Sequence, residues 1–150
     1  MTLEARINAD IKTAMKEKRK DDLRGLRAIK QAIQLAQTDG TGQAIDAKRE
    51  TQMLQKLVKS RKDSLKIYED QGREDLAETE RQEIKTIEAY LPEQVSEAEL
   101  KEILSGVIAD TGASSMKDMG RVMGAAQAKL AGRADGKAIS AAVKELLSGK

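Results

Sequence analysis

The sequence contains no cysteine and no histidine, and it also lacks phenylalanine and tryptophan. Without cysteine the chain has no disulfides, thiolate nucleophiles or sulfur-based zinc sites. Without histidine it lacks the commonest general base and the commonest metal ligand. We therefore expect no self-contained catalytic site, no metal and no cofactor. Tyr68 and Tyr90 are the only aromatic residues, so an aliphatic core is required, as is typical of helical bundles.

Proline and long apolar runs are almost absent as well. Pro92 is the single proline, so most of the chain lacks the strongest helix breaker. No stretch approaches the roughly 20 apolar residues that cross a bilayer. The first ten residues, MTLEARINAD, do not have the apolar core of a signal peptide. We therefore expect a cytoplasmic protein without a membrane partner.

Charge is abundant but nearly balanced. The 150 residues include 27 Lys and Arg against 25 Asp and Glu, which gives a formal charge of +2. A chain with this balance is not a polycation. Any affinity for nucleic acid must therefore come from the segregation of charge on the surface.

Helical periodicity divides the first 92 residues into four segments. Apolar residues at helical spacing predict a first helix over 3–18, and Asp21 or Asp22 is placed to cap a second. The Gly- and Asp-containing stretch 38–42 predicts a loop, after which Asp46 is placed to cap a long third helix that ends at Gly72. A fourth helix is predicted to extend to Leu91.

The remaining residues predict three shorter helices. Leu91-Pro92 marks a bend, because proline disfavours helix at the residue before it. Ser96 and Glu99 form a predicted capping box, and Ser115 is placed to cap the next helix. The predicted fold is therefore all-α, with a four-helix unit over 1–92 and a three-helix unit over 93–150, joined at the Leu-Pro bend.

Two charged residues interrupt the apolar stripes of the third and fourth helices. Arg61 lies within the stripe of the third helix and Glu80 within that of the fourth. In an antiparallel hairpin that turns near Gly72 they would stand at similar heights, which predicts an ion pair that fixes the helix register. An acid/base site is the functional alternative, but it would need further partners in a cleft.

Basic residues also follow one face of the third helix, while the fourth helix is acidic. The basic face comprises Lys56, Lys59, Lys62 and Lys66. Such a face can bind phosphates, although similar stripes are common on ordinary solvated helices. Both interpretations stay open on the pattern alone.

A denser group of cations surrounds the predicted turn between the last two helices. Lys129, Arg133 and Lys137 lie within nine residues, together with Gly132, Asp135 and Gly136. Glycine lets a ligand approach the backbone, and the start of a helix offers unpaired amides that suit a phosphate. Gly132 as a C-cap and Asp135 as an N-cap explain the same residues structurally. Capping would still leave Arg133 and Lys137 projecting.

Several short segments resemble the YqeY family, whose domain also forms the tail of the B subunit of the glutamine-dependent tRNA amidotransferase. The resemblance covers essentially the whole chain. It rests on the order and spacing of 27–30 (RAIK), 62–64 (KDS) with Tyr68, 72–77 (GREDLA) with Glu80, 90–92 (YLP), 119–123 (MGRVM) and 132–136 (GRADG).

The resemblance implies two helical subdomains and a non-catalytic accessory role in which the chain docks on tRNA. The carbon–nitrogen ligase label attached to the family, with glutamine as amido-N-donor, implies a partner in tRNA aminoacylation or translation rather than catalysis by this chain. The expected RNA-binding residues are Lys129, Arg133, Lys137, Lys117, Arg121, Lys56 and Lys59. The alternative is a protein–protein adaptor that docks through its acidic fourth helix or through an apolar seam.

Overall fold

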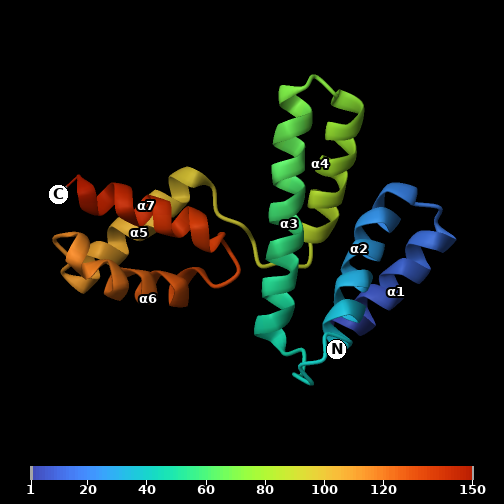
Figure 1. The fold of residues 1–150 in the computed structure, drawn as a ribbon, viewed down its shortest axis with the longest axis horizontal. Helices are drawn as coiled ribbons and strands as arrows, with labels where there is room; N and C mark the ends of the chain where they lie inside the picture. The colour runs from blue at the N-terminus through green and yellow to red at the C-terminus, as the bar shows by residue number, and fades with distance from the viewer. Residues whose placement is uncertain (1, 150) are drawn as a thin grey trace. The chain divides into compact units, whose positions relative to one another are not determined.

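The computed structural model describes residues 2–149, and no strand occurs among them (Figure 1). The predicted all-α class is confirmed. Contacts divide the chain into two compact units, Met1–Pro92 and Glu93–Lys150. None of the helices in the described part is long and apolar enough to cross a membrane.

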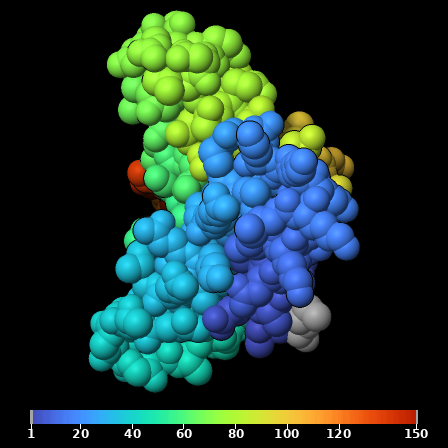
Figure 2. All heavy atoms as spheres, turned by 90° about the vertical axis from the view of Figure 1, so that its right-hand side faces the viewer, coloured from blue at the N-terminus to red at the C-terminus, as the bar shows by residue number. Residues whose placement is uncertain are grey.

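The first unit consists of two helical hairpins. They are formed by α1 (Leu3–Lys16) with α2 (Lys20–Gln37) and by α3 (Ala47–Asp70) with α4 (Glu74–Glu88). Helix α2 also packs on α4, and the shared core is aliphatic. Figures 1 and 2 show that α1 and α2 cover one part of the α3–α4 hairpin and leave its turn uncovered. The fully buried large side chains of this core are Ile7, Ile29 and Ile87.

The predicted cap of α3 is confirmed, whereas the predicted cap of α2 is wrong. Asp46 accepts a hydrogen bond from the Arg49 amide at the start of α3. Helix α2 begins earlier than expected, at Lys20, and its N-cap residue makes no side-chain cap. The reason is a tight turn in which Lys18 adopts a φ of 58° and the chain returns to helix at once. The same turn ends α1 at Lys16, two residues before the predicted end.

The aspartates predicted to cap α2 lie in its first turn instead. There Asp22 pairs with Arg19, at 2.6 Å, and Asp21 pairs with Arg24, at 3.0 Å. Carboxylates are also favourable at this position because the helix dipole is positive at its N-terminus.

The predicted ion pair between Arg61 and Glu80 is wrong in its acidic partner. The Nε atom of Arg61 lies 3.6 Å from a carboxylate oxygen of Glu83, and both side chains are largely buried, with exposed fractions of 19% and 16%. Arg61 and Glu83 are each eleven residues from Gly72, so equal helical rise places them at the same height. The turn at Gly72, where φ is 69°, therefore selects Glu83 as the partner.

Glu80 remains close to this pair. Burial raises the pKa of its carboxyl group, and the nearby Glu83 raises it further, while Arg61 opposes both effects. A carboxyl whose pKa is raised by folding binds its proton more tightly in the folded state. Its contribution to stability is therefore present at acidic pH and is lost as pH rises through the folded-state pKa.

We expect Glu80→Gln to increase the free energy of unfolding at pH 7 and to change it little at pH 4, where Glu80 is largely protonated in either state. Denaturant unfolding at the two pH values measures the difference. Glu78→Gln is the control, because Glu78 is exposed and pairs with Arg81 at 3.2 Å. Equal effects of Glu80→Gln at both pH values would contradict the assignment.

Helices α2 and α4 approach closely at one glycine. Gly25 is buried in α2, and a Cβ atom built on it would lie 2.7 Å from Cβ of Thr86 on α4. Real Cβ atoms essentially never approach so closely. The absence of a side chain at Gly25 therefore sets the distance between these two helices.

Helix α4 ends at Glu88, before the predicted end at Leu91. Leu91 cannot easily continue a helix because it precedes Pro92, the last residue of the first unit. Tyr90 and Leu91 instead form tight turns, with amides that donate to Ile87 and Glu88.

The second unit contains α5 (Glu97–Thr111), a short 3-10 helix η1 (Met116–Asp118), α6 (Met119–Leu130) and α7 (Gly136–Ser148). The predicted capping box of Ser96 and Glu99 is confirmed, and Gly112, the C-cap that follows α5, has a φ of 70°. Ser115 caps η1 rather than α6, because one 3-10 turn precedes the regular helix. The fully buried large residues of the core are Leu104, Ile108, Val122, Leu130, Val143 and Leu147.

Candidate functional site

The turn between α6 and α7 is built around Gly132. Helix α6 has its C-cap at Ala131, and Gly132 follows with a φ of 76°, so the predicted C-cap is displaced by one residue. The Gly132 carbonyl accepts a hydrogen bond of 2.7 Å from Nε2 of Gln94. The Arg133 carbonyl accepts one of 3.0 Å from the Val95 amide. These contacts fix the turn against the segment that leads into α5.

The start of α7 is not closed by a side chain. Asp135 occupies the N-cap position as predicted, but its carboxylate makes no capping hydrogen bond. The amides of the first helical turn have no partner within a helix, and they carry the positive end of its dipole. Gly136 and Lys137, the first residues of α7, are both exposed. This end of α7 is therefore accessible to an anion.

Two lysines at this turn are free of acidic partners. Lys129 and Lys137 are exposed, and neither forms an ion pair with any described residue. Arg133 is half-buried, and its Nε donates to the carbonyl of Glu93 at 3.2 Å. A carbonyl positions the guanidinium without neutralising its charge. The structure thus keeps three cationic side chains at one turn.

Charge is also segregated along the second unit. Residues 93–112 contain five Asp and Glu and a single basic residue, Lys101. Residues 113–150 contain seven Lys and Arg against three Asp and Glu. The α6–α7 turn therefore belongs to the basic part of a unit whose total charge is zero.

The other two cations predicted in this unit lie at the opposite end of α6. Lys117 belongs to η1, and Arg121 lies in the first turn of α6, where its Nη2 is 3.1 Å from Asp118. Arg121 and Lys129 are eight residues apart, which is about 12 Å along a helix. The structure therefore gathers Lys129, Arg133 and Lys137 and separates Lys117 and Arg121 from them.

Lys56 and Lys59 belong to α3 in the first unit. Lys56 is exposed and has no ion pair with a described residue. Lys59 lies 3.5 Å from Asp63, one turn further along the helix. An exposed pair of this kind is weak and leaves the lysine available to solvent. Its neighbour Lys62 pairs with Glu88 of α4 at 3.4 Å, so the predicted basic stripe is partly compensated.

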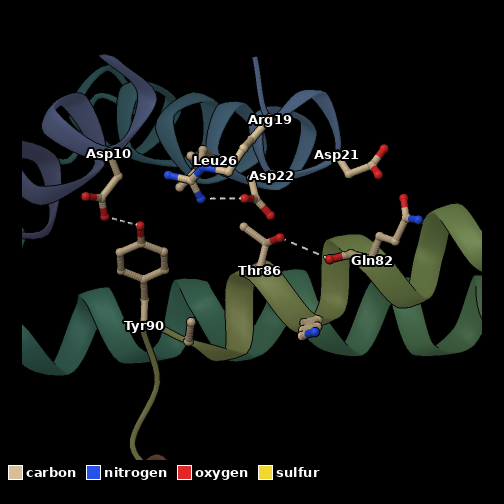
Figure 3. Close-up of a pocket in the computed structure, with 10 residues that line it drawn as sticks. Asp10, Arg19, Asp21, Asp22, Leu26, Gln82, Thr86 and Tyr90 are labelled. Atoms are coloured by element: carbon tan, nitrogen blue, oxygen red, sulfur yellow. Dashed lines mark hydrogen bonds and ion pairs between the residues drawn. The ribbon is translucent and has the colours of Figure 1, made fainter. Parts of the chain in front are cut away.

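The first unit also contains a polar cleft between the α1–α2 turn and α4, with a volume of about 550 Å³. In Figure 3 the Tyr90 hydroxyl points to Asp10 and donates a hydrogen bond to it. Burial and this carboxylate raise the pKa of Tyr90 well above its ordinary value. The guanidinium of Arg6 lies 5.0 Å from the centre of the Tyr90 ring. Arg19 is held between Glu17 and Asp22.

Arg19 and Asp22 of this cleft are paired with each other, Asp21 is paired with Arg24, and Asp10 accepts from Tyr90, so we interpret the cleft as a structural polar cluster. The contact between Asp10 and Tyr90 has no signal in the sequence. Eighty residues separate the two, and no local spacing connects them. No group of acidic side chains suited to a metal ion occurs among residues 2–149.

Two comparisons with known proteins give matches that cover nearly the whole chain. The model of the YqeY family, described as Yqey-like protein, matches residues 4–147. The chain is also 29% identical over 148 residues to the altered inheritance of mitochondria protein 41, mitochondrial, of Pyrenophora tritici-repentis. That alignment covers 97% of this chain and 81% of the relative.

Proposed function

Since the chain belongs to the YqeY family, we propose that it is a non-catalytic accessory module that binds tRNA through the α6–α7 turn. Lys129, Arg133 and Lys137 are the leading contacts. Lys117 and Arg121 are further contacts of the second unit, and Lys56 and Lys59 are contacts that the first unit makes on its own. The proposed setting is the cytoplasm, with a protein partner in tRNA aminoacylation or translation.

One observation supports this proposal above the others. The α6–α7 turn combines two exposed lysines that lack described acidic partners with an N-cap residue, Asp135, whose side chain does not cap α7. Cations beside a helix N-terminus favour a phosphate, because point charges and backbone donors act on the same oxygens.

The composition limits how the RNA is recognised. Binding to unpaired bases normally uses aromatic side chains as stacking platforms. Tyr90 is committed to Asp10 and Arg6, and Tyr68 is half-buried on α3. We therefore expect the module to recognise the phosphates and the shape of a folded RNA rather than its sequence.

Binding of total tRNA at increasing salt tests the proposal. Phosphate contacts release counterions, so the logarithm of the affinity falls linearly with the logarithm of the salt concentration, with a slope of about 0.7–0.9 per contact. The three contacts at the turn therefore account for about 2–3 of the slope, and each further lysine or arginine contact adds about 0.7–0.9. Fluorescence anisotropy with labelled tRNA measures it.

Two results would contradict the proposal. One is the absence of tRNA binding at about 50 mM salt, where phosphate contacts are strong. The other is glutaminase or amidotransferase turnover by the purified protein alone, which would replace an accessory role by catalysis.

A further inference from the structure

An open apolar groove of about 460 Å³ lies between α2 and α3 in the first unit. Its walls come from the second half of α2 and from residues 49–61 of α3. The uncharged residues that line it are Ala32, Leu35, Ala36, Met53, Leu57 and Ser60.

Leu35 is the most exposed large hydrophobic side chain among the described residues. Its exposed fraction is 63%, and it shares the groove with half-buried Ala32, Met53 and Leu57. Scattered exposed hydrophobic residues are ordinary, but this one continues an apolar surface made by two helices. This part of the groove therefore exposes to solvent apolar side chains of the kind that form the core.

The charged residues of the groove are not balanced. Arg49 binds Asp39, and its Nη1 also donates to the Gln43 carbonyl at 3.0 Å. Lys56 is exposed and has no acidic partner within the described residues. Arg61 is the remaining charged residue that lines the groove.

Arg61 is only partly satisfied where it lines the groove. Its Nη1 donates to the Leu57 carbonyl at 3.1 Å, and its Nε is buried without a hydrogen bond. The carboxylate of Glu83 approaches Nε only to 3.6 Å. An arginine carries five N–H donors, so this guanidinium retains the capacity to bind another carboxylate. The groove therefore has an apolar floor, one cation without a described acidic partner in Lys56, and a second in Arg61 whose guanidinium is only partly engaged by Glu83.

We propose that this groove binds an acidic amphipathic helix of a partner protein. Apolar side chains of that helix, at spacings of three and four residues, would cover Leu35 and Leu57. Its carboxylates would pair with Lys56 and Arg61, which makes the charge of the two surfaces complementary. The site lies in the first unit and shares Lys56 with the proposed RNA contacts, whereas its apolar contacts through Leu35 and Leu57 are separate from them.

The same charges argue against two other occupants. A second copy that docked groove to groove would place one cationic surface against another, which is unfavourable. Nucleic acid would pair with Lys56, but it offers no apolar ridge for Leu35 and Met53. An acidic amphipathic helix can cover the apolar floor of the groove and also pair with its cations, Lys56 and Arg61.

A synthetic peptide provides the probe for this site. It is a helical peptide of about 18 residues, with leucine on one face and glutamate on the other, and its control carries lysine in place of each glutamate. With the full-length protein, the acidic peptide is expected to bind and to perturb the NMR signals of residues 32–36 and 53–61. The basic peptide is expected not to bind.

Matched variants separate the apolar and the charged contributions. Leu35→Gln and Lys56→Glu are each expected to weaken binding of the acidic peptide by about tenfold, the loss typical of a contact at the centre of an interface. Ile67→Gln, also an exposed apolar residue of α3, and Lys48→Glu, an exposed lysine outside the groove, are expected to leave binding unchanged. Circular dichroism confirms that each variant is folded.

Four outcomes would overturn the proposal. The first is that the acidic peptide does not bind, or that it perturbs NMR signals of residues outside the groove. The basic peptide binds equally well, so that charge plays no part. Sedimentation shows a dimer that Leu35→Gln dissociates, which assigns the groove to a second copy. Lys56→Glu and Leu35→Gln weaken tRNA binding by the same factor, which assigns it to RNA.

Discussion

Replacing Lys129 and Lys137 together by glutamine is expected to weaken tRNA binding by about ten- to a hundredfold near physiological salt. Both side chains are exposed and lack described acidic partners, so their charge is available to phosphates. Each phosphate contact that is lost should also lower the salt slope by about 1. Adding Arg133→Gln is expected to weaken binding further.

The lysine pair provides the cleaner test, because Arg133 also has a structural contact. Its Nε donates to the Glu93 carbonyl, so Arg133→Gln alters the turn as well as the charge. Anisotropy titrations at several salt concentrations give both affinity and slope. Lys20→Gln with Lys101→Gln removes the same charge elsewhere and is the control. If that control loses as much affinity as the turn variant, binding depends on net charge and the proposed turn is wrong.

Gly25→Leu is expected to lower the free energy of unfolding of the first unit by about 3 kcal/mol or more. Overpacking in a well-packed site usually costs about 1–3 kcal/mol, and here the obstacle is the Cβ of a neighbouring helix rather than the end of a flexible side chain. Even Gly25→Ala should destabilise, although alanine in a helix is otherwise favoured over glycine by roughly 1 kcal/mol. Hydrogen exchange of α2 and α4 amides measures the effect.

Gly106 supplies the control for this prediction. It lies within α5, and nothing lies within 4 Å of a Cβ atom built there. Gly106→Ala should therefore stabilise the second unit by up to about 1 kcal/mol, the opposite sign to Gly25→Ala. Thr86→Gly combined with Gly25→Ala should recover part of the lost stability, because it removes the opposing Cβ. Additive effects of the two substitutions would contradict direct contact.

Local features of the chain were predicted well from sequence. Asp46 and the Ser96 capping box were located correctly because a cap depends on residues three positions apart. The failed cap of α2 also has a local cause, the turn at Lys18, but lysine seldom adopts a positive φ and gave no signal. Gly25 was missed because its environment comes from Thr86, far away in the sequence.

In the candidate RNA site too, local features could be predicted from the sequence and contacts between distant residues could not. Sequence spacing alone brought Lys129, Arg133 and Lys137 together, since all three flank one short turn. It could not show that Arg133 is held by Glu93, or that Asp135 leaves the start of α7 uncapped. The groove between α2 and α3 had no counterpart in the sequence beyond the general expectation of an apolar seam. Its lining comes from two helices that only the packed fold aligns.

The sequence by itself determined an all-α chain with an aliphatic core, the family to which it belongs, and the order of its basic and acidic segments. These properties follow from composition and from periodicity within single helices. Only the tertiary structure decided that Arg61 pairs with Glu83, that α2 touches α4 at Gly25, and which cations remain unpaired. Those outcomes depend on distances between helices, and interhelical distances are set by side chains that are remote from one another in the sequence.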